Sequence, residues 1–111
     1  MTSSSERRRA PRALADFPIS LSPAEGAAPA RLKDLSTIGL CCTTAQEMPE
    51  MTVVGIDLQL PGSAASHKVQ GAIVRCDPIQ DDGFEVAVYF TEIGNEAKHA
   101  VGAYVAQAQP A

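Results

Sequence analysis

The sequence predicts a small all-β domain, a six-stranded antiparallel barrel or sandwich with one helix at its C-terminal end. Three observations lead to this fold class. Short segments alternate between apolar and polar residues, turn signals recur about every ten residues, and only the last segment changes to helical spacing. With 111 residues, 45% of them hydrophobic, the chain can build one modest core, so we expect a single domain.

Six segments carry the strand pattern. The first begins at Phe17 and alternates through Ile19 and Leu21, and it can tolerate Pro18 if it lies at a sheet edge. The fourth shows the clearest alternation and ends at a Pro-Gly turn signal. The expected strands cover residues 17–21, 30–35, 38–42, 54–60, 69–76 and 84–90, with loops that include 23–29 and 77–83.

The C-terminal segment repeats apolar residues at helical spacing. Ala97, Val101 and Tyr104 fall on one face, so we expect an amphipathic helix over residues 96–106 with Asn95 as its N-cap. The apolar stripe of this helix needs a partner surface. One end of the strand barrel would cover it, and a dimer interface would satisfy the same pattern.

The distribution of charge favours a small anionic partner. The formal net charge is -4, yet four of the nine Lys and Arg residues lie between positions 7 and 12. An acidic body argues against binding to long nucleic acid, whereas a local basic arm can bind one compact polyanion. Pro11 favours an extended arm over a helix. Because no acidic run lies nearby in the sequence, we expect the chain before Phe17 to be mobile until a ligand binds.

The two ends of the sequence and its hydropathy suggest a compartment. Residues 1–5 are small and polar, so we expect a disordered tail there, and residues 107–111 form a second short tail. No apolar run approaches the roughly 20 residues that span a bilayer, and the hydrophobic region of a signal peptide is missing. We therefore expect a cytoplasmic protein without membrane insertion.

The residues with metal-binding or nucleophilic chemistry form no recognisable site. The three cysteines include the neighbours Cys41 and Cys42, and both histidines stand alone, so we expect reduced thiols with apolar roles and no metal. Asp81 and Asp82 precede a glycine and are explained as hairpin-loop residues. No local signature supports a cysteine nucleophile, and P-loop and Rossmann glycine patterns are absent. We therefore do not expect an enzyme.

One short motif lies between two of the expected strands. Asp34-x-Ser36-x-x-Gly39 joins the second and third strands, which places its side chains at a rim of the barrel. Taken alone, this motif is typical of a turn, since Asp and Ser are common turn residues and Gly permits a bulge. A second motif, Arg8-x-x-x-Arg12, lies upstream, with one strand-sized segment between the two.

Together the two motifs resemble the two-part signature of PilZ domains, the bacterial receptors for the second messenger cyclic di-GMP. The resemblance covers about residues 6–105, and residues 71–75 and 85–90 look like the last strands of the family. One departure is Ala87, which stands where the family commonly has Gly. The resemblance implies a six-stranded PilZ-type β-barrel with a C-terminal helix over residues 6–106, including an arginine arm at 7–12.

The resemblance also implies a ligand site whose residue types suit cyclic di-GMP. Arginine can donate two hydrogen bonds to the edge of guanine, pair with phosphate or stack on a base. A carboxylate can accept from the N1-H and N2-H groups of guanine, a serine adds a polar contact, and a glycine lets the backbone approach closely. The implied ligand-binding residues are Arg8, Arg9, Arg12, Asp34, Ser36 and Gly39.

The function implied by the resemblance is signalling without catalysis. The arm would close over cyclic di-GMP, and an unidentified downstream protein would read the altered surface of a monomer or weak homodimer that needs no cofactor. One alternative is a PilZ-like structural adaptor without nucleotide binding, for example in pilus or motility regulation. A barrel for single-stranded nucleic acid is a further alternative, but the acidic body and the few aromatic residues argue against it.

Overall fold

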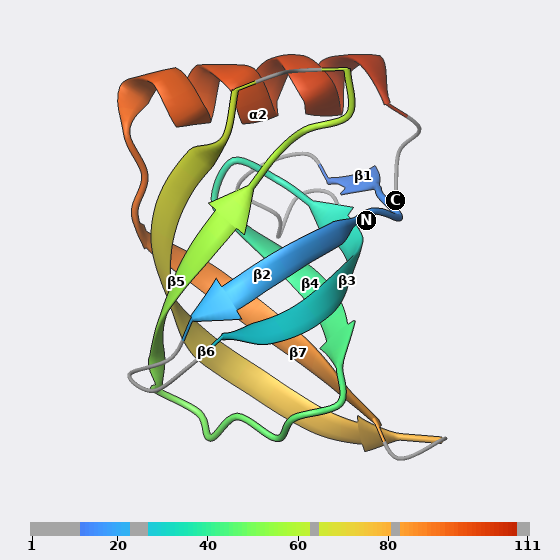
Figure 1. Cartoon of the computed structure of the whole chain (residues 1–111). Helices are drawn as coiled ribbons and strands as arrows, with labels where there is room; N and C mark the ends of the chain where they lie inside the picture. The colour runs from blue at the N-terminus through green and yellow to red at the C-terminus, as the bar shows by residue number, and fades with distance from the viewer. Residues whose placement is uncertain (1–11, 23–26, 63–64, 81–82, 109–111) are drawn as a thin grey trace, which may run out of the picture.

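The computed structural model describes residues 12–22, 27–62, 65–80 and 83–108. These residues form strands and one helix, arranged as Figure 1 shows. The elements are β1 (Ala13–Leu14), β2 (Pro18–Ser22), β3 (Ala28–Leu35), β4 (Gly39–Thr44), β5 (Val53–Leu58), β6 (His67–Ile79), β7 (Gly83–Glu92) and α2 (Asn95–Gln107).

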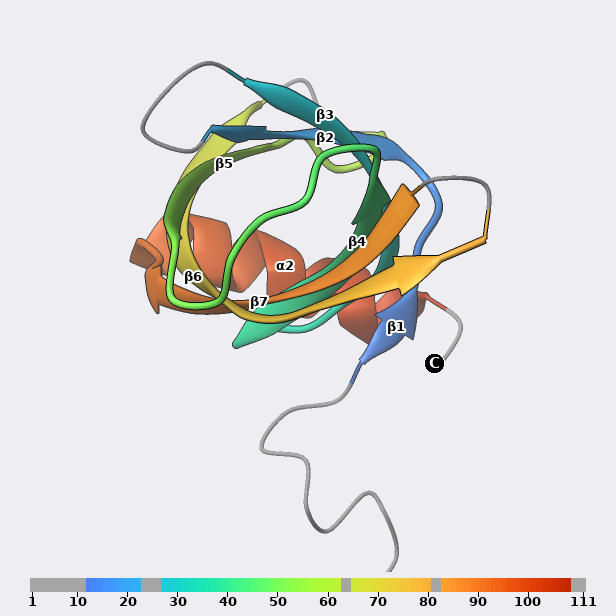
Figure 2. The same cartoon turned by 90° about the horizontal axis from the view of Figure 1, so that it is seen from below.

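The sheet closes on itself. Its strand order is β1-β3-β2-β5-β6-β7-β4, and the last strand returns to pair with β3. Every pairing is antiparallel, so β2 to β7 make a closed six-stranded barrel, which Figure 2 shows from one end. The predicted fold class is confirmed. The short strand β1, which the sequence pattern did not predict, adds to β3 at Leu35 and Asp34.

The period-two pattern of the strands creates the core. In β5, for example, Val54, Ile56 and Leu58 are at most 2% exposed, while the residues between them face outward. Corresponding residues of the other strands fill the barrel interior with aliphatic side chains. The largest fully buried side chains include Leu21, Leu32, Leu35, Leu40, Leu58 and Ile73 of the strands and Met48 of the segment between β4 and β5.

The hairpin of β6 and β7 is longer than expected. The loop predicted at 77–83 is wrong at both ends, because Asp77 pairs with Glu85 and Ile79 pairs with Gly83 in the ladder. The proline at position 78 is compatible with a strand here, because β5 pairs with β6 only as far as Ala72. The other edge of β6 therefore has no β5 ladder at this point, and a missing N–H does no harm. The Asp81–Asp82 pair lies outside the described residues.

The helix α2 lies across one end of the barrel, as Figure 1 shows, and the predicted docking at a barrel end is confirmed. Ala97 and Val101 are buried against the core, and the rings of Phe17 and Tyr104 meet edge to face with centroids 6.0 Å apart. The predicted N-cap is wrong: Asn95 is the first helical residue, and the N-cap is Gly94, which makes no side-chain cap bond. In the described part of the chain, no helix has the length and apolarity of a membrane span.

The segment that follows the arginine run differs from the expectation of a free arm. Ala13 is fully buried, and the Ala15 N–H donates to the Lys33 carbonyl at 2.9 Å. The structure therefore places residues 12–16 beside β3, and mobility of the arm without ligand stays a prediction. The expectation rested on acidic neighbours in the sequence, whereas the pairing with β3 and an acidic partner come from about twenty residues away. The rest of the predicted arm and the two predicted tails lie mostly outside the described residues.

Candidate functional site

The turn between β3 and β4 is organised by one buried serine. Ser36 is fully buried, and its Oγ accepts hydrogen bonds from the N–H groups of Ile38 and Gly39, each at 3.2 Å. The same hydroxyl donates to the Gly39 carbonyl at 3.2 Å, and the Ser36 N–H reaches that carbonyl at 2.9 Å. Ser36 therefore shapes the turn from within. A direct contact between Ser36 and a ligand stays a prediction.

Gly39 occupies a position where a side chain does not fit. It pairs with Tyr89 of β7, and a Cβ added to it would lie 2.3 Å from the Val88 carbonyl oxygen. Real Cβ atoms do not approach an oxygen this closely, so the strands would have to move apart. The close approach that Gly39 permits is that of β4 to β7, and a role of this glycine in ligand binding stays a prediction.

Asp34 points away from the core because β3 contains a bulge. The pairing of β3 with β4 shifts between Leu32 and Asp34, so one extra residue is accommodated in β3. Leu32 and Leu35 are both buried, whereas the two residues between them, Lys33 and Asp34, keep exposed surface. The bulge thus presents a cation and a carboxylate side by side on the outer face of the barrel.

An ion pair joins the two halves of the sequence motif. Arg12 Nη1 lies 2.7 Å from Asp34 Oδ1, and the two side chains are 30% and 23% exposed. Arg12 comes just before β1, and β1 pairs with the end of β3, so the added strand holds the guanidinium next to the bulge. A planar guanidinium beside a partly exposed carboxylate offers both donors and acceptors to a ligand.

The outer face next to Asp34 carries small side chains at the centre of one row across the strands. The strand register aligns Asp34 with Cys41 of β4, Ala87 of β7 and Arg75 of β6. The next outward row on the same face contains Tyr89, which is 47% exposed. Because Cys41 and Ala87 are small, a planar group can lie over the sheet between the charged ends of this row.

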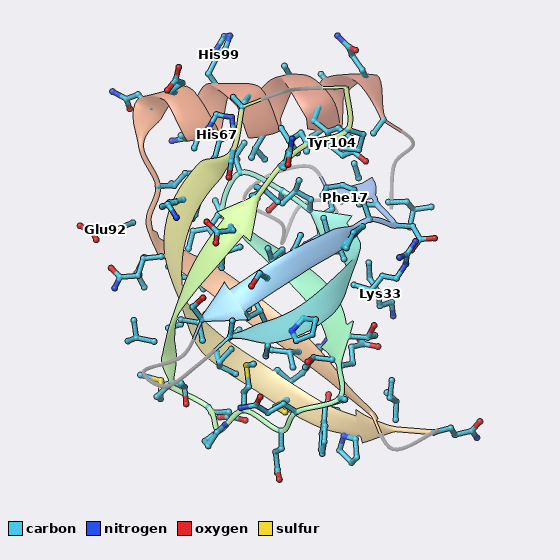
Figure 3. The ribbon with its side chains drawn as sticks, viewed as in Figure 1. Phe17, Lys33, His67, Glu92, His99 and Tyr104 are labelled. Atoms are coloured by element: carbon cyan, nitrogen blue, oxygen red, sulfur yellow. The ribbon has the colours of Figure 1, made fainter. Side chains whose placement is uncertain are left out.

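A carboxylate in this face binds cations from both sides. Glu85 Oε1 lies 2.9 Å from Lys33 Nζ, and Glu85 Oε2 lies 3.3 Å from Arg75 Nη2. The hydrogen bond from Lys33 lowers the pKa of the Glu85 carboxyl below its ordinary value and raises the pKa of Lys33. Figure 3 shows Lys33 on the outside of the barrel. We define Lys33, Glu85 and Arg75 as the β3–β7–β6 charge cluster.

All three cysteines are free, and Cys41 and Cys42 are buried as small apolar residues would be, whereas Cys76 is partly exposed. Burial raises the pKa of the Cys41 thiol to about 11 and that of Cys42 to about 12, so both stay protonated near neutral pH. Cys41 Sγ also donates to Glu85 Oε2 at 3.6 Å. No group of three or more His, Cys, Asp or Glu side chains in the described ranges is arranged to hold a metal ion.

Four of the six predicted site residues are in the described part of the chain, and they meet at one end of β3. Arg12 and Asp34 pair there, and Ser36 and Gly39 form the turn beyond them. Arg8 and Arg9 lie outside the described residues. Sequence reasoning missed the charge cluster, because its residues come from β3, β7 and β6, which no local pattern brings together.

Two solved structures have the same fold. The inhibitor of motility MotI/DgrA from Bacillus subtilis matches with a TM-score of 0.81 and 15% identity, over 91% of this chain. This chain spans about half, 50%, of the length of that protein. The PilZ domain of YcgR from Escherichia coli, solved with c-di-GMP, matches with a TM-score of 0.65 and 15% identity, over 86% of each chain. No curated protein matches the sequence.

The sequence itself matches the PilZ domain family over residues 6–107, which is nearly the entire chain. The closed barrel with its C-terminal helix and the turn that carries the Asp-x-Ser-x-x-Gly motif agree with that match. The chain therefore belongs to the PilZ domain family.

Proposed function

We propose that the protein is a receptor for cyclic di-GMP and that the ligand binds on the outer face beside Asp34. The observation that carries the proposal is the 2.7 Å contact between Arg12 and Asp34, because it brings the two separate halves of the motif to one place. Family membership and the structural likeness to an E. coli PilZ domain solved with c-di-GMP support the same ligand.

The chemistry of these side chains suits the ligand. The second oxygen of the Asp34 carboxylate can accept from the N1-H and N2-H groups of a guanine, while the guanidinium of Arg12 keeps donors for a phosphate or the guanine edge. Arg8 and Arg9 would add further donors from the arm. The buried Ser36 and the close-packed Gly39 would contribute by holding the turn and Asp34 in position.

Signal relay would use the elements that contact this site. The Phe17 ring, which follows β1, packs against Tyr104 of α2, as Figure 3 shows. Gly102 of α2 lies over the motif turn, since a Cβ added there would lie 3.7 Å from the Thr37 methyl group. Closure of the arm over the ligand would therefore change two contacts of α2, the one with Phe17 and the one with the motif turn. A downstream protein would bind the altered surface.

Isothermal titration calorimetry with cyclic di-GMP tests the proposal. Arg12→Ala and Asp34→Ala should each weaken binding by roughly ten- to a hundred-fold, because each removes a charge-assisted contact of about 1.5–3 kcal/mol. Arg8→Ala should act similarly. The matched control is Lys68→Ala, which removes another exposed ion pair, that with Asp57, away from the motif.

Thermal unfolding of the variants separates binding from folding. The Arg12–Asp34 pair is partly exposed, so its loss should change the free energy of unfolding by only about 0–1 kcal/mol. Normal affinity in Arg12→Ala and Asp34→Ala would place the ligand elsewhere. A wild-type protein that gives no heat with cyclic di-GMP would refute the receptor function.

In that case the structural adaptor becomes the better account. One observation supports the adaptor function: the B. subtilis protein of the same fold is an inhibitor of motility, and the structural likeness covers 91% of this chain. The two candidates share a protein partner and differ in the nucleotide. Both are binding functions, and neither assigns a catalytic step to the chain.

A further inference from the structure

We propose that Lys33 and Arg75 are two additional phosphate-binding residues of this site and that Glu85 is a built-in competitor for them. The inference rests on the proposed function, because the anion is a phosphodiester of the bound cyclic dinucleotide. None of these three residues belongs to the two motifs.

The strand register places the charge cluster on the same face as Asp34. Lys33 is the direct neighbour of Asp34 in the bulge, and Arg75 is the last residue of the row that begins at Asp34. Three inter-strand steps separate the ends of this row, or about 14 Å at the usual strand spacing. A ligand lying over Cys41 and Ala87 therefore reaches cations at both ends.

The geometry around Glu85 resembles what a phosphodiester would need. Its carboxylate carries one negative charge and offers one oxygen to Lys33, at 2.9 Å, and the other to Arg75, at 3.3 Å. A phosphodiester also carries one negative charge on two non-bridging oxygens. It can therefore accept the same two donors, provided that Glu85 gives them up or shares them.

Differences in exposure indicate which partner is accessible. The Lys33 and Arg75 side chains are 50% and 52% exposed, whereas that of Glu85 is 26% exposed. The cations thus extend over a carboxylate that lies closer to the sheet. Arg75 is further oriented by Asp77, 3.1 Å from its Nε. Exposed ion pairs contribute little to stability, so the cations can move from Glu85 to a ligand at low cost.

The competition predicts opposite signs for the two kinds of substitution. Lys33→Ala and Arg75→Ala should each weaken cyclic di-GMP binding about three- to thirty-fold, because a phosphate loses a cationic donor. Glu85→Gln should tighten binding about three- to ten-fold, because it removes the charge that competes for those donors. A purely structural cluster would not give tighter binding on loss of its central carboxylate.

The experiment is calorimetric titration of each variant with cyclic di-GMP at two salt concentrations. Asp57→Asn is the matched control for Glu85→Gln, since Asp57 also holds an exposed lysine, Lys68, at 3.1 Å. Lys68→Ala is the control for the two cation variants. The controls should bind as the wild type does, and Lys33→Ala and Arg75→Ala should bind with a weaker salt dependence.

Comparison of the double variant Lys33→Ala/Arg75→Ala with the triple variant that adds Glu85→Gln completes the test. If Glu85 acts by competing for the cations, its substitution should no longer tighten binding once Lys33 and Arg75 are both alanine. Wild-type affinity in Lys33→Ala and Arg75→Ala, or weaker binding in Glu85→Gln, would overturn the inference while the proposed function stands. Absence of binding by the wild-type protein would overturn both.

Discussion

Replacement of Ser36 by alanine should destabilise the fold and weaken ligand binding together. The Ser36 hydroxyl is fully buried and makes three hydrogen bonds within the turn, two as acceptor and one as donor. An alanine side chain fits in the space of the Ser36 side chain but cannot accept a hydrogen bond. The Gly39 N–H, which is buried, loses the Ser36 oxygen, whereas the Ile38 N–H is only part-buried and can turn to water.

The size of the effect follows from these contacts. An unsatisfied buried donor costs about 1–3 kcal/mol, and we expect Ser36→Ala to fall in that range. For a domain of this size, each kcal/mol lowers the melting temperature by about 4–8 °C. Because the turn positions Asp34, we also expect weaker binding of cyclic di-GMP than in the wild type.

Thermal and urea unfolding monitored by circular dichroism measure the first effect, and calorimetry measures the second. Ser22→Ala is the matched control, since Ser22 is an exposed strand residue. It should unfold at nearly the wild-type temperature. If Ser36→Ala is as stable as Ser22→Ala, the buried hydroxyl does not hold the turn, and the structural role assigned to it is wrong.

Three further predictions follow from the packing and the pKa shifts. Gly39→Ala should lower the free energy of unfolding by about 1–3 kcal/mol, because the added Cβ clashes with the Val88 carbonyl. Gly102→Ala should raise it by up to about 1 kcal/mol, because it replaces a helical glycine where a Cβ has room. Urea unfolding measures both changes, and equal effects of the two substitutions would contradict the packing described at Gly39 and Gly102. An aromatic disulfide reagent should react with one thiol, that of Cys76, much faster than with the buried pair, and fast reaction of all three would refute the burial. The pKa of the Glu85 carboxyl is lowered in the folded protein, so its ion pairs stabilise the fold above its ordinary value of 4.5. This stabilisation is lost as the pH falls through the lower folded pKa, so the difference in unfolding free energy between wild type and Glu85→Gln should shrink as the pH falls below 4.5.

The sequence was sufficient to predict the barrel because its strands are half-buried and their side chains alternate. Val54, Ile56 and Leu58 illustrate this, since a one-residue slip would expose all three. The helix followed equally well from its apolar stripe. The ends of elements were less predictable: Pro78 suggested a loop, but it lies where the outer edge of β6 has no ladder from β5, so the strand continues.

The sequence predicted the motif residues of the candidate site, but it did not predict the charged residues around them. The position of Asp34, Ser36 and Gly39 at a turn follows from local chemistry, which is readable in a single stretch. The partners of Glu85 come from β3 and β6, which no local pattern brings together. The same holds for the pairing of Arg12 with Asp34, which depends on the short strand β1. Contacts of this kind require the register of the whole barrel.

The most direct test of the central claim is an amide NMR titration of the wild-type protein with cyclic di-GMP, with GTP and cyclic GMP as controls. We predict saturable shifts for the amides of residues 34–41 and 85–89 and for Arg75, which cover the face beside Asp34. The controls should shift these amides far less. No shifts with excess cyclic di-GMP, or shifts confined to the hollow lined by residues 68–70 and 91–94, would contradict the account.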